Sequence, residues 1–520
     1  MSRSAICAPG ACWQTSDVVE SNVLVDADIY YATFCRAALQ ARRYIYITGW
    51  QFDTQARLLR PGPDTALWHP LELLPFLNHL CERTPELEIY ITAWDYSLVY
   101  ALEREWMQKL KFSFKSHPRV HFEFLNHPEG GGCHHQKMVI VDSHVAFLGG
   151  LDLCDARWDT REHTPRDPAR FDVNDKPYKA FHDVQVALRG PVVGALTELF
   201  RDGWRRAVGE GKLPHENEPP LSGDPFELKS LTEERGLPLR ARRVAISRTE
   251  LIDVHHPPIC ELQALLERAI SNARRLIYIE NQYFTSRAIA QALCKRMADP
   301  DAGKLHIVLV MPNGADSPKE DFVLGNRQRA VRGLVAEFAK KYGHELRLLM
   351  SSEATEQDPT PATFIHSKVM IVDDEFVTIG SANLTNRSMR VDRELNVAFE
   401  TSLEHPDDSE RLREDIRALR ASLLNEHAGT NDSEQFLTID ALLEHLDPVC
   451  KDPNSKLRCQ ELSAPEGDDD PFLIAVFDPS TPLEWSNIDD TLEHAFDSND
   501  GLVRKGAQKV GQRLGVVDIE

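Results

Sequence analysis

The sequence predicts an α/β fold built from two similar halves, because two separate stretches recur at nearly the same distance. "ARRYIYI" begins at Ala41 and returns as "ARRLIYI" at Ala273, 232 residues later. The pattern H-x-K-x-x-x-x-D begins at His135 in "HHQKMVIVD" and returns at His366 in "IHSKVMIVD", 231 residues later. Two unrelated stretches that repeat at almost one offset indicate an internal duplication.

Each half has helical and strand patterns in the same order. The helical patterns "DIYYATFCRAALQARR" and "CELQALLERAISNARR" each run into an apolar strand. A second helix and a second strand follow, with "ELEIYITAW" in the first half matching "KLHIVLVMP" in the second. The H-x-K strand comes next. Strands that alternate with helices predict a sheet covered by helices, and therefore two similar α/β/α sandwich domains.

Composition changes along the chain suggest the domain boundaries. "VGEGKLPHENEPPLSGDP" is rich in Pro, Gly and charge, as linkers are, and no Lys or Arg occurs from Glu461 to Asp500. We therefore expect a first half, a linker, a second half and an acidic C-terminal extension, at residues 1–210, 211–245, 246–425 and 426–520.

Composition also limits the class of protein. The N-terminus has no apolar signal-peptide core. The sequence also has no uninterrupted run of 18 apolar residues, which a membrane-spanning helix would need. Ten cysteines without paired spacing are typical of reduced thiols in the cytoplasm. A net charge of −22 opposes general binding to nucleic acid. We expect a cytoplasmic protein that reaches membranes, if at all, from the surface.

The repeated pattern places two polar side chains on one face of a strand. Side chains at i and i+2 share a face, so His135 lies beside Lys137, and His366 beside Lys368. The aspartates that complete the two patterns, Asp142 and Asp373, belong to the candidate catalytic set. Each aspartate lies five residues after the lysine of its motif, an odd number, so its side chain should point to the other face of the strand. We therefore expect both aspartates to be structural.

A turn of small residues follows each H-x-K strand, and such turns let backbone N–H groups approach an anion. The candidate residues in these turns are Gly150 and Asp152 in the first half and Ser381 and Asn383 in the second. Two imidazoles, two ammonium groups and these donors suit displacement at a phosphodiester. One histidine would attack phosphorus and the other would protonate the leaving alcohol.

This chemistry requires no metal and no other cofactor. Metal binding is the alternative for the cluster His127, Cys133, His134 and His135, because Cys and His are common zinc ligands. The second half contains no matching Cys/His set, so the duplication favours catalysis over metal binding at the H-x-K strands.

From Ala32 to Leu424 the sequence resembles the phospholipase D superfamily, whose members carry two such HKD motifs. The resemblance rests on "HHQKMVIVD…FLGGLDLCDARWD", "FHDVQVALRGP", "IYIENQYF" and "HSKVMIVDDEFVTIGSANLTNRSM…DRELNV". The arrangement is most similar to bacterial phospholipases and phosphatidyltransferases with both halves on one chain. It implies two phospholipase D-like domains about a pseudo-two-fold axis, with the active site in the cleft between them.

The resemblance also implies roles for individual residues. His135 would form a covalent phosphohistidine, and His366 would protonate the leaving headgroup and then activate water or another alcohol. Lys137, Lys368 and Asn383 would hold the phosphate, with Asp152 a weaker candidate at the position matching Asn383. Asp183 would orient His135 and Glu394 would orient His366, since a reactive imidazole needs an acceptor on its other nitrogen. Glu280, in "IYIENQYF", would line the cleft.

Cleavage of phospholipid headgroups to phosphatidic acid, with possible transfer to other alcohols, is the function that the resemblance implies. Cardiolipin synthase-like phosphatidyl transfer is the alternative, and a superfamily nuclease fits the acidic charge less well. We expect a monomer, because both motifs lie on one chain. The basic and aromatic stretch at residues 106–120 could contact a membrane surface, or it could be an ordinary solvated helix. Four aromatic residues follow strands and could shape a substrate pocket or cap the core: Trp50, Phe52, Trp94 and Tyr96.

Overall fold

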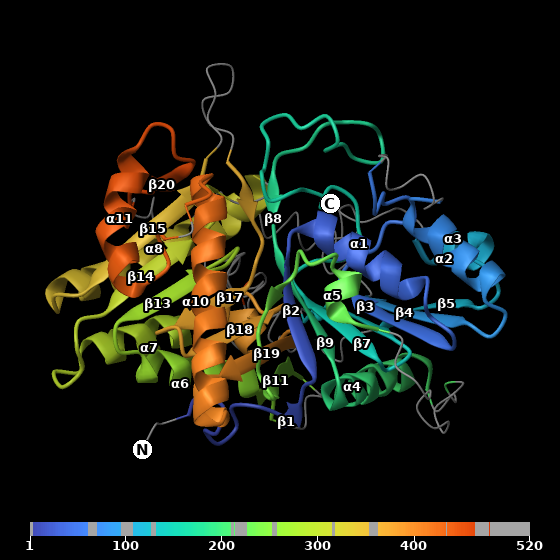
Figure 1. Cartoon of the computed structure of the whole chain (residues 1–520), viewed down its shortest axis with the longest axis horizontal. Helices are drawn as coiled ribbons and strands as arrows, with labels where there is room; N and C mark the ends of the chain where they lie inside the picture. The colour runs from blue at the N-terminus through green and yellow to red at the C-terminus, as the bar shows by residue number, and fades with distance from the viewer. Residues whose placement is uncertain are drawn as a thin grey trace, which may run out of the picture.

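The chain forms two large β-sheets side by side, each with helices on its faces (Figure 1). The computed structural model describes residues 4–60, 70–94, 108–125, 132–209, 213, 226–251, 257–314, 318–352, 362–432, 434–462 and 478.

Within these residues the first sheet has eight strands, in the order β10-β2-β9-β7-β6-β3-β4-β5. Their bounds are β2 (Glu20–Val25), β3 (Tyr44–Gly49), β4 (Glu88–Trp94), β5 (Val120–Leu125), β6 (Met138–Val141), β7 (Val145–Gly149), β9 (Val184–Arg189) and β10 (Leu237–Pro238).

In the same described part of the chain, the second sheet has ten strands, in the order β1-β11-β19-β18-β17-β13-β14-β15-β20, with β12 beside β11. Their bounds are β1 (Gln14–Asp17), β11 (Arg243–Glu250), β12 (Ile259–Cys260), β13 (Leu276–Glu280), β14 (His306–Val310), β15 (Glu345–Ser351), β17 (Val369–Val372), β18 (Phe376–Gly380), β19 (Glu394–Glu400) and β20 (Leu457–Cys459).

The two sheets repeat one topology. β2, β9, β7, β6, β3, β4 and β5 occupy the same order as β11, β19, β18, β17, β13, β14 and β15. In both sheets the H-x-K strand, β6 or β17, runs antiparallel to its neighbours, whereas the next pairs, β3 with β4 and β13 with β14, are parallel. The predicted α/β class and its duplication are therefore confirmed.

Helices cover both faces of each sheet, so the central strands are buried on both sides and read as continuous apolar runs. The helices of the first half are α1 (Ala27–Ala38), α2 (Leu73–Arg83), α3 (Gln108–Lys115), α4 (Pro191–Val208) and α5 (Leu228–Leu231). Those of the second half are α6 (Glu261–Asn272), α7 (Arg287–Met297), α8 (Pro318–Lys341), α9 (Asn386–Arg390), α10 (Pro406–Ala428) and α11 (Ile439–Lys451).

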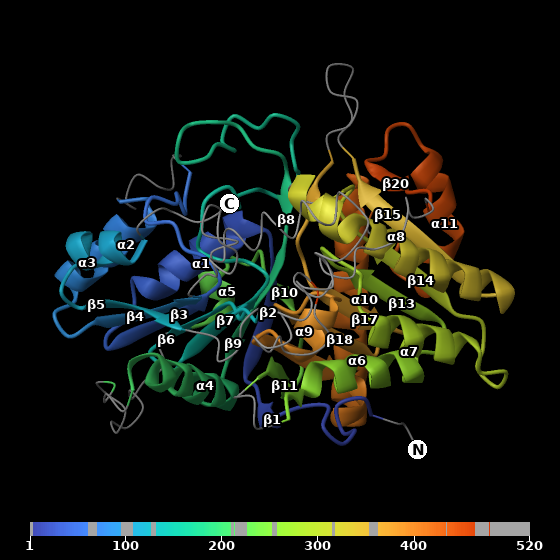
Figure 2. The same cartoon turned by 180° about the vertical axis from the view of Figure 1, so that it is seen from behind.

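In the described part of the chain, three large hydrophobic cores fill the spaces between these layers. One lies between the first sheet and the outer helices α1 and α2, and another between the second sheet and α6, α7 and α8, which Figure 2 shows on the back of the molecule. The third joins the inner faces of both sheets through α4 and α10. Because this central core is continuous, it holds the two halves against each other.

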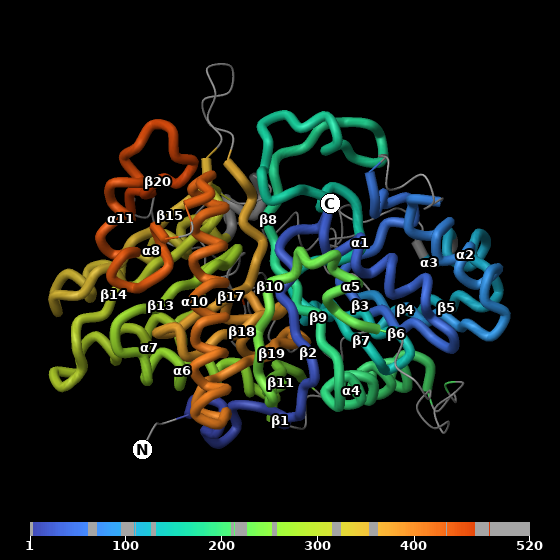
Figure 3. Tube along the Cα trace, in the orientation of Figure 1, coloured from blue at the N-terminus to red at the C-terminus, as the bar shows by residue number. Residues whose placement is uncertain are grey.

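The chain crosses between the halves at places that the sequence did not predict. β1, from the expected first half, pairs with β11 in the second sheet, and Figure 3 follows the chain to that position. β10 lies inside the expected linker and pairs with β2. The expected linker is thus partly sheet, and the exact domain boundaries stay a prediction.

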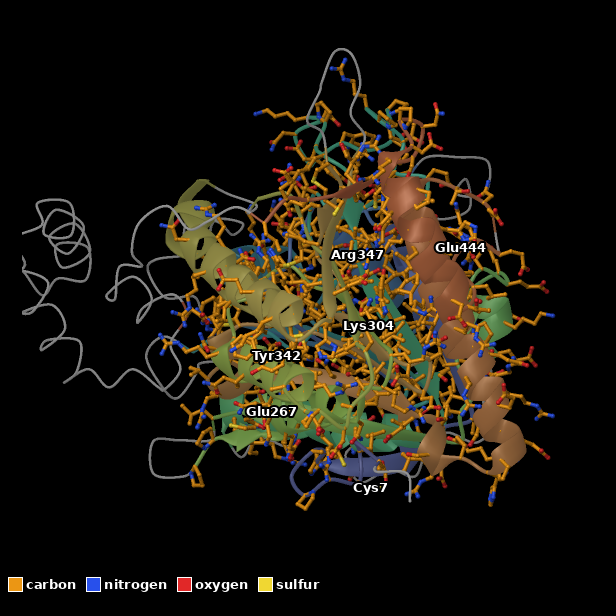
Figure 4. All side chains as sticks on the ribbon, turned by 90° about the vertical axis from the view of Figure 1, so that its left-hand side faces the viewer. Cys7, Glu267, Lys304, Tyr342, Arg347 and Glu444 are labelled. Atoms are coloured by element: carbon orange, nitrogen blue, oxygen red, sulfur yellow. The ribbon has the colours of Figure 1, made fainter. Side chains whose placement is uncertain are left out.

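The C-terminal region also differs from the expected separate extension. β20 pairs with β15, and Arg347 Nε of β15 donates to Asp447 Oδ1 of α11 at 2.8 Å; Figure 4 labels Arg347 at this edge. Asp478 is buried, and its Oδ2 accepts from Asn386 Nδ2 at 2.7 Å. Residues 426–459 are therefore part of the second half. Nearly all of the acidic stretch 461–500 lies outside the described residues, as do Tyr96, Trp106 and His127.

No helix in the described part of the chain combines the length and the apolar character needed to cross a bilayer.

Candidate active site

The two H-x-K segments meet where one half of the protein pairs with the other. The backbone N–H of His135 donates to the carbonyl of Arg393 at 2.9 Å, and the N–H of His366 donates to the carbonyl of His182 at 2.9 Å. A two-stranded sheet, β8 (Phe181–His182) with β16 (Phe364–Ile365), continues the second contact. Each histidine is therefore fixed by the backbone of the opposite half.

The carboxylate beside each histidine also comes from the opposite half. His135 Nδ1 lies 3.0 Å from Glu394 Oε2, and His366 Nδ1 lies 2.5 Å from Asp183 Oδ2. The predicted pairs, Asp183 with His135 and Glu394 with His366, are therefore wrong. Asp183 directly follows His182, and Glu394 directly follows Arg393. The carbonyls of His182 and Arg393 accept from the backbone N–H of the opposite half's histidine, so each carboxylate faces that histidine.

Both carboxylates are buried and held in place. Ser381 Oγ donates to Glu394 Oε2 at 2.5 Å, and Ser388 Oγ donates to Glu394 Oε1 at 2.7 Å. The N–H of Val184 donates to Asp183 Oδ1 at 2.8 Å. A carboxylate on Nδ1 keeps the proton there and leaves Nε2 of each imidazole as the reactive atom.

The small-residue turns support these carboxylates. A Cβ added to Gly150 would lie 2.1 Å from Asp183 Oδ1, so only glycine leaves room for that carboxylate. Ser381 occupies the matching position in the second half, where its hydroxyl bonds to Glu394 instead. We expected both residues at the phosphate, but the contacts described here are to the carboxylates.

The lysines have unequal partners. Lys137 Nζ lies 3.2 Å from Asp152 Oδ2, and both side chains are buried. Lys368 Nζ donates to the carbonyl of His366 and has Gln282 Oε1 at 3.5 Å. Burial lowers the pKa of Lys368 to about 7. The negative charge of Asp183 opposes this shift, and the positive charge of Lys137 adds to it. Lys137 and Lys368 both contribute positive charge near His366, which suits the binding of an anionic phosphate.

Asp152 and Asn383 occupy matching positions but do different things. Asp152 bonds to Lys137 and accepts from the N–H of Trp50 at 2.9 Å, so it supports the site and does not donate to phosphate. Asn383 is buried, and its Oδ1 has no hydrogen-bond partner. An amide in this setting is suited to donate to an anion.

The electrostatics also distinguish His366. Burial, followed by the positive charges of Lys368 and Arg157, lowers the pKa of His366 well below its usual value. Burial raises the pKa of Asp183 to about 6. His366 is therefore a neutral imidazole in the protein without a bound anion.

Asp142 and Asp373 are anchors and lie outside the catalytic cluster, as their parity predicted. Asp142 accepts from the backbone N–H groups of Arg42, Arg43 and Tyr44 at 2.7, 2.9 and 2.9 Å. Asp373 accepts from the N–H groups of residues 274–276 in the same way. These bonds tie the far end of each H-x-K strand to the repeated "ARR" stretch. Their place in the candidate catalytic set is therefore corrected to a structural role.

The expectation for Glu280 is wrong, and the described residues do not support the less favoured metal alternative. Glu280 is fully buried, and its Oε2 accepts from Ser367 Oγ at 2.7 Å and lies 3.0 Å from His182 Nε2, so it is behind His366 and does not line a cleft. Of the candidate metal cluster, His134 Nε2 contacts Thr48 Oγ1 at 2.6 Å and His135 contacts Glu394. The described members of that cluster do not gather their donor atoms at one point.

Arg157 and Phe181 lie near the histidines and were not predicted to belong to the site. Arg157 contributes positive charge at His366 and stacks on Phe181, whose ring centre lies 5.3 Å from that of His366. Trp50 stacks on Trp94 and lies 6.4 Å from His135 between ring centres, as the aromatic pattern suggested. Phe52 is instead buried in the core of the first half. The only sequence signal for Arg157 was its place just after the small-residue turn.

This chain is similar to several known proteins. Residues 266–419 match the family model described as "Cardiolipin synthase, PLD-like domain". Phospholipase D alpha 1 of Ricinus communis is 25% identical over 77% of this chain and 64% of its own length. Phospholipase D1 of Saccharomyces cerevisiae is 25% identical over 72% of this chain and 26% of its own length. The chain thus spans less than two thirds of the length of these curated relatives.

A solved structure supports the fold. The phosphatidylserine synthase of Haemophilus influenzae superposes with a TM-score of 0.51 at 12% identity, covering 84% of this chain and 92% of that one. The repeated sheet topology, the two HKD segments and the similarity to phospholipases D over about three quarters of this chain support its placement in the phospholipase D superfamily.

Proposed function

We propose that this protein is a phospholipase D-type phosphodiesterase that cleaves the headgroup of glycerophospholipids and releases phosphatidic acid. The observation that carries the proposal is the pair of crossed contacts, in which each histidine has a buried carboxylate on Nδ1 and its Nε2 left for chemistry. Two histidines with two lysines supply a nucleophile, a proton donor and the charge that a phosphodiester displacement needs.

In the first step, Nε2 of His135 attacks phosphorus, and the bond from phosphorus to the headgroup oxygen breaks. His366 gives its Nε2 proton to that oxygen, so the headgroup leaves as an alcohol with a neutral hydroxyl group. His366 is neutral without substrate, so it must take up this proton when substrate binds. The anionic phosphate offsets the nearby positive charges and so raises the pKa of His366. The phosphatidyl group is then held on His135 as a phosphohistidine.

In the second step, His366 takes a proton from water, and the resulting hydroxyl oxygen attacks phosphorus. The bond between phosphorus and His135 breaks, and phosphatidic acid leaves. An alcohol in place of water would give a new phosphodiester by the same route, which is transphosphatidylation. The assignment of His135 as nucleophile follows the family resemblance, and the near symmetry of the two pairs makes it a matter for experiment.

Cardiolipin synthase-like phosphatidyl transfer is the second candidate, favoured by the description of the matching family model and by the fold shared with a phosphatidylserine synthase. The two functions differ in the acceptor alone. The test is to incubate the purified protein with phosphatidylcholine or phosphatidylglycerol, with and without added glycerol, and with single-stranded DNA. Phosphatidic acid from phosphatidylcholine supports the main proposal. Cardiolipin from phosphatidylglycerol without phosphatidic acid favours transfer, and cleavage of DNA alone favours a nuclease.

We further propose that the protein works as a monomer in the cytoplasm and meets its lipid at a membrane surface. The central core joins both halves within one chain, which supports a complete site in the monomer. All ten cysteines are free, which suits a reducing compartment. On α3, Phe114 is 80% exposed beside the exposed Lys115, and an apolar ring next to a positive charge suits an anionic lipid surface.

A further inference from the structure

A second cluster of titratable side chains lies buried behind the histidine site. The nearest donor atoms of Asp26, His163, His182 and Glu426 all lie within 4.8 Å of one another, and all four residues are buried. His163 Nε2 is 3.2 Å from Glu426 Oε1 and 3.7 Å from Asp26 Oδ2. His182 Nδ1 is 2.5 Å from the same Glu426 oxygen and 3.2 Å from Asp26 Oδ1. Two nitrogens and two carboxylates thus converge on one point.

The outer nitrogens of both histidines also meet carboxylates. His163 Nδ1 lies 3.0 Å from Asp159 Oδ2, and His182 Nε2 lies 3.0 Å from Glu280 Oε2. A carboxylate on the far nitrogen of a ligating imidazole is the usual second layer of a metal site, where it fixes the tautomer and raises the basicity of the ligand. Both histidines have this partner, which an ordinary buried histidine does not need.

One oxygen at the centre has no hydrogen-bond partner. Asp26 Oδ2 is buried and faces the cluster, whereas Asp26 Oδ1 accepts from the N–H of Asp183 at 3.2 Å. The other oxygen of Glu426, Oε2, is bonded to Arg161 Nε at 2.5 Å. A buried carboxylate oxygen without a donor is costly, and a cation at the cluster would satisfy it.

Without a cation the cluster requires unusual protonation. Both nitrogens of His163 and of His182 face carboxylate oxygens, so each imidazole must carry two protons or a carboxyl must be protonated. A divalent ion could replace the two inner protons with no change in total charge.

We propose that Asp26, His163, His182 and Glu426 bind one divalent transition-metal ion. Two imidazoles and two carboxylates in a compact arrangement suit Zn²⁺ best among the common ions. On binding, His163 loses the proton on Nε2 and His182 loses the proton on Nδ1, so two protons are released. Asp159 and Glu280 keep the remaining N–H groups in place.

The position of the cluster gives the ion a structural role. Its ligands come from the start of α1, the segment before β8, β8 itself and the end of α10, so the ion joins the two halves across the central core. His182 directly precedes Asp183, the partner of His366. The ion would therefore hold the histidine site in place without touching substrate, and its presence does not depend on the proposed lipid activity.

The test is the metal content of the full chain, measured by inductively coupled plasma mass spectrometry after expression in zinc-supplemented medium and gel filtration. We expect close to one Zn²⁺ per chain. Asp26→Asn keeps the size of the side chain and the bond from Asp183, and it should lower the metal content at least about tenfold. His121→Gln is the matched control, because His121 also pairs with a carboxylate, Glu88, at 2.6 Å, but lies near the surface. Its metal content should stay unchanged.

A second measurement covers the case in which Asp26→Asn does not fold. Wild-type protein unfolded in denaturant with a chelator, then refolded with or without Zn²⁺, should regain its melting temperature only with the ion. Zinc addition to the metal-free protein should release about two protons. Protein that is stably folded with no stoichiometric metal, and that does not change its melting temperature on adding Zn²⁺, would overturn the proposal and leave two imidazolium ions in the cluster.

Discussion

Glu394, in the second half of the chain, holds the catalytic candidate His135 of the first half, with 3.0 Å between Oε2 and Nδ1. The reverse contact, from Asp183 of the first half to His366 of the second, completes the exchange. Neither half therefore supplies both a histidine and the carboxylate that orients it. The duplication has produced one site with shared parts, and several consequences can be measured.

The crossed contacts predict which variants behave alike. Asp183→Asn should resemble loss of His366, with a covalent intermediate that forms but breaks down slowly. Glu394→Gln should resemble loss of His135, with slow formation of any intermediate. Each should lower kcat by about 10²- to 10⁴-fold, because a misoriented imidazole cannot transfer a proton or attack. Rapid-quench kinetics can separate the two steps.

The surface variant Glu123→Gln, which removes an exposed ion pair with Lys109, is the control and should leave both steps unchanged. If Asp183→Asn slowed formation and Glu394→Gln slowed breakdown, either the pairs would be uncrossed or the roles of the two histidines would be exchanged. The adduct position in the final experiment below distinguishes these two explanations.

Gly150 should tolerate no side chain. Its missing Cβ would lie 2.1 Å from Asp183 Oδ1, so Gly150→Ala must displace the carboxylate that orients His366. We expect kcat to fall at least about tenfold with KM nearly unchanged, since the change affects proton transfer more than binding. Gly194→Ala is the control, because a Cβ there, on α4, meets nothing within 4 Å. Equal activity of the two variants in a steady-state assay would contradict this account of Gly150.

The duplicated fold was predictable because repetition is visible in a single sequence. "ARRYIYI" and "ARRLIYI" run into strands β3 and β13, and the aspartates at positions 142 and 373 accept from backbone N–H groups just before these strands. The repeated sequences therefore predict both a strand and the aspartate that holds its start in place. The odd spacing between each aspartate and the lysine of its motif was enough to predict that the aspartates lie away from the histidines.

The exchange of carboxylates was not predictable, because a repeat describes each half and not the way that the halves meet. Asp183 and Glu394 are near their own H-x-K strands in the fold, but the direction of their side chains depends on pairing across the interface. Glu426 is the first residue of the acidic extension expected at residues 426–520. The structure extends α10 to Ala428, with Glu426 at the centre of the buried cluster.

The pH dependence of kcat/KM should report Lys368. Its pKa is lowered to about 7, and only the charged ammonium attracts phosphate. The charged fraction in the free protein falls as pH rises through 7, so kcat/KM should decline on the alkaline side of neutrality. Lys368→Arg keeps its charge over this range, because a guanidinium stays protonated. The decline should move to higher pH in that variant even if the overall rate is lower. If the decline of kcat/KM occurred at the same pH in Lys368→Arg, it would have to be caused by the titration of another group.

The protein should be active as a monomer. Both histidines, both lysines and both carboxylates of the site come from one chain, and one continuous core joins the halves. Specific activity should therefore stay constant over a 100-fold dilution, while light scattering reports the mass of one chain, 58.9 kDa. Activity that falls with dilution together with the loss of a dimer would contradict the expectation.

The most direct test of the account is the identity of the residue that carries the covalent intermediate. His366→Ala protein is mixed briefly with a p-nitrophenyl phosphodiester, whose leaving group needs little protonation, and quenched without acid. Intact-protein mass spectrometry followed by peptide mapping locates any adduct. We predict a persistent phosphoryl adduct on His135, because breakdown requires His366 to activate water. His135→Ala should trap nothing. An adduct on His366 in the His135→Ala protein would reverse the two roles, and robust turnover by both variants would contradict the two-histidine mechanism.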